Sequence, residues 1–248
     1  MILVDTLPAD AILDPVEPTG PRWLLGLDLG QTTDYTALSI AERVVVPTGR
    51  YRDSGEKRMV QMQRQMPRPA PVFHREERRD LHVRFLKRFD LRTDYVVMAS
   101  VVKGYVAQLP PGPAQPVLLI DHTGVGRGVF DIFRHAGLGI PLIGVTFTGG
   151  QEAKQNEDHP WEWTVPKKDL VGALQVLLQG QRLKIAQGLP DGDAFLKEMQ
   201  TFRMTIKPNA NVTYEAAREG DKDDLVLSVS LVCWGNEVLL GQRGGIVL

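Results

Sequence analysis

Short apolar runs divide the first half of the chain into predicted strands. The first run, Trp23–Leu27, leads into Asp28, a turn at Gly30 and a second apolar stretch. We therefore predict a buried strand over 22–29, a tight turn, and a returning strand over about 36–46 that ends at Pro47-Thr48-Gly49. The same reasoning predicts further strands over 81–89, 117–120, 141–147, 183–185 and 212–215.

Helical patterns separate the later strands. The sequence predicts helices over about 94–109, 127–136, 166–179, 193–205 and 225–234, and a polar loop over 151–164 that contains Trp161 and Trp163. Strands that alternate with helices after an opening meander indicate an α/β domain with a mixed central sheet flanked by helices. We expect this domain to span 22–248, with a hairpin or loop over about 47–80. The proline-rich residues 1–21 form a predicted arm or linker.

Charge is unevenly distributed along the 248 residues. The net charge is −1, yet residues 50–92 hold 13 Lys and Arg against 6 Asp and Glu. A basic segment on an acidic body indicates an anionic partner such as nucleic acid, although a solvated arm has the same composition. One cysteine, Cys233, excludes a disulfide framework and fits a reducing compartment. Neither a signal peptide nor a membrane-spanning run is present in the sequence, so we expect no membrane partner.

Acidic residues stand at three positions where they need an explanation. Asp28 ends an apolar strand, Asp121 ends the most apolar strand, and Asp223-Asp224 precede the last apolar helix. An ionised carboxylate in such a strand is costly unless a cation compensates it. Capping of the helix is a competing explanation for the Asp223-Asp224 pair. If the carboxylates converge, their oxygen atoms suit Mg²⁺ or Mn²⁺, and two such ions can support phosphodiester hydrolysis.

Four segments in order extend this interpretation: LGLDLGQTTDYTALSI, VLLIDHTGVGRGVFDIF, VPKKDLVGALQVLLQGQRLKI and DKDDLVLSVSLVCW. Together they resemble the nuclease domain of phage large terminase subunits, which has a ribonuclease H-like fold. The resemblance implies that Asp28, Asp121, Asp223 and Asp224 ligate metal and that double-stranded DNA is cleaved endonucleolytically. It also implies a phage or prophage origin, action in the bacterial cytoplasm, and as partners a separate packaging ATPase, a small terminase or a portal protein.

Two departures from that family are visible. Lys222 stands where family members often have histidine, and a cation there would either weaken metal binding or contact a phosphate. No P-loop motif G-x-x-x-x-G-K-[ST] occurs in the sequence. The chain is therefore expected to be a nuclease module without its motor: a split subunit, an isolated domain or a stand-alone enzyme.

Basic residues near helix starts are candidates for DNA contact, namely Arg127, Lys167 and Lys168, with Lys222 beside the acidic pair. The polar residues Asp34, His122 and Asp131 are read as turn or surface residues, and Trp161 and Trp163 as cover over the core edge. Two other functions stay open at this point. The LDLGQTTD segment imitates the phosphate motif of actin-like and sugar-kinase phosphotransferases, and an idle DNA-binding assembly module would carry the same carboxylates.

Overall fold

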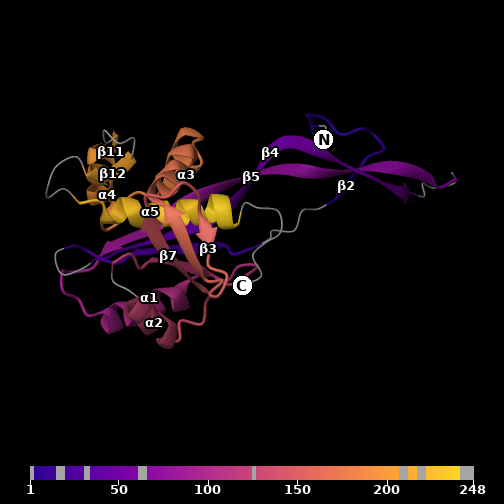
Figure 1. The fold of residues 1–248 in the computed structure, drawn as a ribbon. Coiled ribbons are helices and arrows are strands. Elements are labelled where there is room, and N and C mark those ends of the chain that lie inside the picture. The colour runs from indigo at the N-terminus through magenta and orange to yellow at the C-terminus, as the bar shows by residue number, and fades with distance from the viewer. Residues whose placement is uncertain are drawn as a thin grey trace. The chain divides into compact units, whose positions relative to one another are not determined.

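The computed structural model describes residues 3–14, 20–30, 34–60, 66–124, 127–206, 212–216 and 222–240. The chain divides into two units, both seen in Figure 1. The small unit comprises Met1–Thr19 and Val44–Asp80, and the large unit comprises Gly20–Arg43 and Leu81–Leu248.

Strands and helices alternate through the large unit. The strands of the chain are β1 Leu3–Val4, β2 Ile12–Asp14, β3 Trp23–Asp28, β4 Ala37–Val60, β5 Arg68–Arg88, β6 Val117–Asp121, β7 Leu142–Thr148, β8 Lys154–Gln155, β9 Glu162–Pro166, β10 Leu183–Ile185, β11 Phe202–Ile206 and β12 Val212–Ala216. The helices are α1 Tyr95–Gln108, α2 Arg127–His135, α3 Lys167–Gln179, α4 Gly192–Thr201 and α5 Asp224–Trp234, followed by a π-helical turn, η1 Gly235–Leu239. The predicted α/β fold is confirmed.

The main sheet is mixed and has the order β10-β5-β4-β3-β6-β7-β9-β8. Strand β3 lies inside it, antiparallel to β4 and parallel to β6. Strands β6, β7 and β9 continue in parallel, and β8 closes that edge in the antiparallel sense. This arrangement confirms the mixed central sheet and gives β3 and β6 the same direction, so that their carboxyl ends meet.

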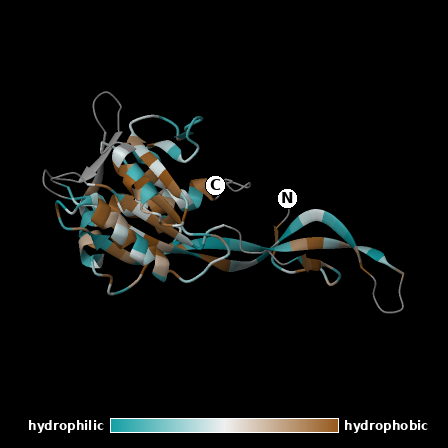
Figure 2. Cartoon of the chain, turned by 90° about the horizontal axis from the view of Figure 1, so that it is seen from below, coloured by the Kyte–Doolittle hydropathy of each residue, from teal (hydrophilic) through white to brown (hydrophobic). Residues whose placement is uncertain are grey.

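Helices cover both faces of the sheet, and each face has its own hydrophobic core (Figures 1 and 2). Leu24 of β3 belongs to the core under α3, α4 and α5, whereas its neighbour Leu25 belongs to the core over α1 and α2. Successive side chains of a strand point to opposite faces. By this alternation Asp28 lies on the same face as Leu24, beneath α5.

Helix α5 lies directly on β3. All of its residues are buried, which suits its apolar sequence. The contact depends on Gly26, because a Cβ atom there would come within 2.2 Å of the Ser228 carbonyl oxygen. That carbonyl accepts a hydrogen bond of 2.9 Å from Ser39 Oγ of β4. The helix is thereby fixed over the strand with its amino end toward the residues that end β3.

In the small unit, the predicted end of the second strand at Pro47-Thr48-Gly49 is wrong. Strand β4 continues to Val60, and β5 begins at Arg68 rather than at residue 81. Gly49 and Gly55 take positive φ values of 82° and 77°, conformations that glycine tolerates and that absorb bends within a strand. Residues 61–65 lie outside the described residues.

The predicted N-terminal arm contributes two short strands to the small unit. Strand β1 pairs antiparallel with β4, and β2 pairs in parallel with β5. Asp14 holds Arg58 through two hydrogen bonds of 2.7 and 2.8 Å. Asp5 lies 3.3 Å from Arg50. Acids near the amino end therefore compensate part of the basic segment within this unit.

Two other predictions are corrected in the large unit. Residues 151–164 are not a plain polar loop, since they include β8 and the start of β9. The indole of Trp163 in β9 packs edge-on against Trp234, with ring centroids 5.6 Å apart, which explains why this polar stretch forms a strand. The helix predicted over 193–205 ends at Thr201, and the chain continues as β11, which pairs with β12.

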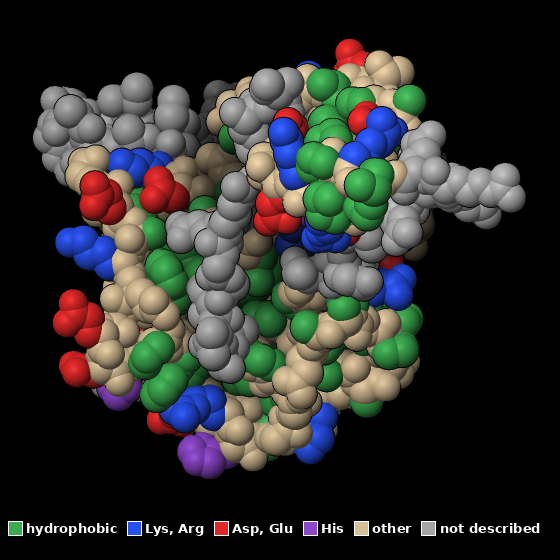
Figure 3. Space-filling view, turned by 90° about the vertical axis from the view of Figure 1, so that its right-hand side faces the viewer, with side chains coloured by type: hydrophobic (Ala, Val, Ile, Leu, Met, Phe, Trp, Pro, Cys, Tyr) green, Lys and Arg blue, Asp and Glu red, His purple; other side chains and the backbone are tan. Residues whose placement is uncertain are grey.

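Side chains of Lys and Arg are interspersed with those of Asp and Glu on the face drawn in Figure 3. Among the described residues, no helix has both the length and the apolar character needed to cross a membrane. The cysteine Cys233 is free and buried in α5.

Candidate active site

Asp28 and Asp121 end two neighbouring parallel strands and lie opposite one another in the β3–β6 register. Both side chains lie on the face covered by α5, and both are buried. Two carboxyl groups buried this close together disfavour each other's ionised form.

Burial dominates the electrostatics of this pair. It raises the pKa of Asp28 well above its ordinary value, and the nearby charges of Asp121 and Asp224 raise it further. Burial also raises the pKa of Asp121, against the effect of two hydrogen bonds from Thr123. The Thr123 backbone N–H donates to Asp121 Oδ1 at 2.8 Å. The two carboxyl groups thus form a centre that favours added positive charge.

Asp224 is brought to the same centre by α5, as the first residue of that helix. Burial raises its pKa to about 6, while the charge of Arg88 lowers it. Its Oδ2 atom is buried and has no hydrogen-bond partner among the described residues. A buried carboxylate oxygen without a partner is unusual and marks a position where an ion or another ligand would be stabilised.

Capping does not explain the Asp223-Asp224 pair. Asp223 occupies the N-cap position of α5, but its side chain makes no capping hydrogen bond. The cap comes instead from Glu198 of α4, whose Oε2 accepts from the Val226 backbone N–H at 2.9 Å. The carboxylate of Asp223 lies 3.4 Å from Lys167 Nζ. A capping hydrogen bond therefore does not account for Asp223 at the helix end.

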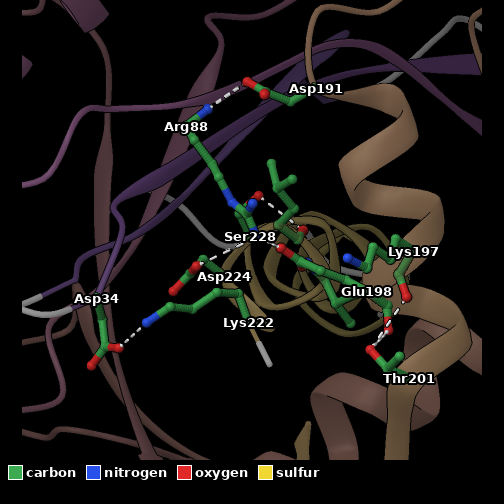
Figure 4. A network of polar contacts seen from close by, with 11 residues as sticks. Asp34, Arg88, Asp191, Lys197, Glu198, Thr201, Lys222, Asp224 and Ser228 are labelled. Carbon is green, nitrogen blue, oxygen red and sulfur yellow. Dashed lines mark hydrogen bonds and ion pairs between the residues drawn. The ribbon is translucent and has the colours of Figure 1, made fainter. Parts of the chain in front are cut away.

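Two cations, Arg88 and Lys222, lie near Asp224 (Figure 4). Arg88 at the end of β5 lies 3.7 Å from Asp224 and pairs with Glu198. Lys222 donates to Asp34 at 2.8 Å. Of the basic residues singled out from the sequence, Lys167 and Lys222 therefore lie beside these acids.

The remaining candidates lie in different surroundings. Lys168 donates to Gln151 at 2.9 Å. Arg127 begins α2, and its side chain lies outside the described residues. His122 is buried and stacks on Phe130 of α2, with centroids 5.6 Å apart. The others make structural contacts: Asp131 pairs with Arg134, and Trp161 lies under the Arg134 guanidinium.

Sequence reasoning missed Arg88 and Glu198. Burial raises the pKa of Glu198 to about 7, the mark of a carboxyl group in an unusual environment. A signal was present in the sequence, since Glu198 follows Phe195 by three residues and so falls on the buried face of α4. Its partner Arg88 is 110 residues away, and no local pattern could pair them.

The donor set fits a hard divalent cation. Four carboxylates, Asp28, Asp121, Asp223 and Asp224, gather where two strands end and a helix begins, and their repulsion calls for positive charge. Within the described part of the chain, no three Asp, Glu, His or Cys side chains are yet arranged closely enough to hold one ion together. The chemistry of the site thus suits Mg²⁺ or Mn²⁺, and the carboxylates must draw together to bind it.

Comparison with known proteins bears on the fold. No protein-family model matches the chain, and neither does any curated protein. The large terminase nuclease of thermophilic phage G20c matches 89% of this chain and 91% of its own, with 17% identity and a TM-score of 0.50. The same nuclease with bound magnesium matches 90% and 91%, with 18% identity and a TM-score of 0.51. The chain therefore has the ribonuclease H-like fold of the nuclease domains of phage large terminases.

Proposed function

We propose that the protein is a metal-dependent endonuclease that cleaves double-stranded DNA by two-metal phosphodiester hydrolysis. The observation that carries this proposal is the convergence of Asp28, Asp121 and Asp224 from three distant segments, with a buried oxygen of Asp224 that accepts no hydrogen bond from the described residues. Similarity in fold to a terminase nuclease crystallised with magnesium supports the same conclusion.

Each carboxylate has a distinct role in this proposal. Asp28 would bridge two ions, Asp121 would hold one, and Asp224 would hold the other with help from Asp223. When bound, two Mg²⁺ or Mn²⁺ ions would supply the charge that activates a water molecule and stabilises the leaving oxygen. The face under α5 shields the carboxylates from solvent, and the backbone that carries them is anchored, since both strands and the helix are part of the core.

Basic residues would hold the DNA backbone. Lys167 and Lys222 lie next to the acids, and Lys168, Arg127 and the basic residues of 50–92 are further candidates for phosphate contact. Contacts to phosphates fix the position of the duplex without reading its bases, so binding should be largely independent of sequence. In a packaging system, the partners would be double-stranded DNA and a separate packaging ATPase, small terminase or portal protein.

Cleavage of a supercoiled plasmid tests the function. The protein should nick or linearise it with Mn²⁺ or Mg²⁺ and be inactive with EDTA. Asp121→Asn should lower the rate by at least about a hundredfold, because a lost ligand removes several kcal/mol of charge stabilisation. Asp131→Asn, a carboxylate on the neighbouring helix α2 that pairs with Arg134, is the matched control and should leave the rate unchanged.

Wild-type cleavage by Asp121→Asn would refute the proposal. Salt-sensitive DNA binding without cleavage in either metal would favour the idle DNA-binding module. Binding of ATP in a calorimeter would favour the phosphotransferase.

A further inference from the structure

Arg88 is held on several sides at the end of β5. Its guanidinium forms an ion pair with Glu198 of α4 and lies 5.1 Å from the centre of the Tyr35 ring. Its backbone N–H donates to Asp191 at 2.8 Å. Figure 4 shows the side chain reaching from the strand toward Glu198 and Asp224. The position of this positive charge is therefore set by its protein neighbours, Glu198 of α4 first among them.

The same guanidinium stops short of Asp224. Its Nη2 atom lies 3.7 Å from Asp224 Oδ2, which is too long for a hydrogen bond. Glu198 Oε1 is the closer partner of Nη2. Charge compensation still operates at 3.7 Å, but the Asp224 oxygen keeps its lone pairs unused.

Glu198 acts through both of its oxygens. Oε1 engages Arg88, and Oε2 accepts from the Val226 backbone N–H in the first turn of α5. One buried side chain thus ties the arginine to the helix that carries Asp224. If Glu198 lost its charge, no other ion pair among the described residues would hold Arg88 away from Asp224.

We propose that Arg88 and Glu198 are positioning residues for the carboxylate site: Glu198 holds Arg88 beside Asp224, near enough to compensate the carboxylate but not to occupy its free oxygen, which stays available to a divalent cation. This proposal rests on the metal site of the proposed function. In this proposal Arg88 competes with the divalent cation for Asp224, and Glu198 restrains Arg88.

The two residues should then affect metal binding in opposite directions. Glu198→Gln keeps an acceptor for Val226 but removes the charge that restrains Arg88, so Arg88 moves onto Asp224 and Mn²⁺ binds more weakly. We expect a loss of roughly tenfold, within the range of interaction energies between contacting residues. Arg88→Gln removes the competitor, so Mn²⁺ should bind at least as tightly as to the wild type. In the double variant, the effect of Glu198→Gln should disappear.

Calorimetric titration with Mn²⁺ alone, without DNA and at pH 8, where the wild-type Glu198 is mostly ionised, tests this in the wild type, the two single variants and the double variant. Arg84→Gln is the matched control, since Arg84 is on the same strand and pairs with Glu42, which Arg22 also holds. Circular dichroism verifies that each variant is folded. An equal loss of affinity from Glu198→Gln with and without Arg88 would mean a merely structural role and would overturn the proposal, as would no loss at all.

Cleavage assays on the same proteins separate this proposal from the nuclease function. Proteins that show the opposed shifts but cut no DNA would support the positioning roles and refute the nuclease. A wild type that cuts DNA, with Mn²⁺ affinity unchanged in every variant, would overturn the positioning roles and leave the nuclease standing.

Discussion

Gly26 of β3 lies directly beneath the carbonyl oxygen of Ser228 in α5, so that even a methyl group would approach that oxygen to 2.2 Å. Gly26→Ala should force the helix away from the strand and lower the free energy of unfolding by about 1–3 kcal/mol. Because α5 carries Asp224, Mn²⁺ affinity should fall as well. Urea unfolding and calorimetry measure the two effects.

A second glycine provides the control for this prediction. Gly172 in α3 has no atom within 4 Å of an added Cβ. Gly172→Ala should therefore stabilise the protein by roughly 0.5–1 kcal/mol, as alanine does inside a helix. If Gly26→Ala were as harmless as Gly172→Ala, the close packing of α5 on β3 would be contradicted.

Local patterns predicted much of the fold. The run that ends at Asp121 was apolar enough to identify a buried strand, and the helix predicted over about 94–109 is α1, which Asp94 caps by accepting from the Val96 N–H. These features depend on neighbours in the sequence, which is why reasoning from the sequence found them. Alternation along β3 is also local, and once the two cores are known it decides which face Asp28 occupies.

Features that depend on distant partners escaped prediction. Pro47 and Gly49 are typical of a turn, but β4 continues through them because its neighbour β5 and the N-terminal strands extend the pairing. Strand β9 depends on the packing of Trp163 against Trp234, which is distant in the sequence. Arg88 looked like one more residue of a basic segment, since only tertiary contact joins it to Glu198.

Neutralising one carboxylate should stabilise the metal-free protein. In EDTA at pH 8, Asp28→Asn removes a buried charge that Asp121 and Asp224 oppose. We expect the free energy of unfolding to rise, because burial and these two charges disfavour the ionised Asp28. The stabilisation that Mn²⁺ gives to the wild type should be lost. A less stable variant in EDTA would contradict the repulsion inferred for the pair.

Stability of the metal-free protein should fall as pH rises. The pKa of Asp224 goes from 3.8 to about 6 on folding, and that of Glu198 from 4.5 to about 7. A raised pKa means that the folded state binds the proton more tightly, so these contributions are complete below the ordinary values and are lost as pH rises through 6 and 7. Urea unfolding in EDTA between pH 4.5 and 7.5 measures the slope.

Glu198→Gln should flatten that slope, because the amide does not titrate. An unchanged slope in this variant, or stability that increases with pH, would show that burial does not raise the pKa of Glu198 in solution.

The small unit offers a test of the basic segment. Asp14 occupies both outer nitrogens of Arg58. If this segment contacts DNA, Asp14→Asn should release Arg58, tighten binding and steepen the dependence of log K on log salt by about one. Fluorescence anisotropy with a short duplex at several salt concentrations measures both. Asp10→Asn, which alters another acid of the N-terminal residues, is the control. Unchanged affinity would exclude Arg58 from the DNA contact.

Because α5 takes its N-terminal cap from Glu198 of α4, its first turn is completed only after α4 has docked. The site also needs Asp28, Asp121 and Asp224, which lie far apart in the sequence. Its assembly therefore requires contacts across most of the chain. Such non-local contacts cost more loop-closure entropy than local ones. A divalent ion would therefore meet all of these carboxylates only in the folded large unit, and its binding energy would count toward cooperative folding of that whole unit rather than toward any fragment.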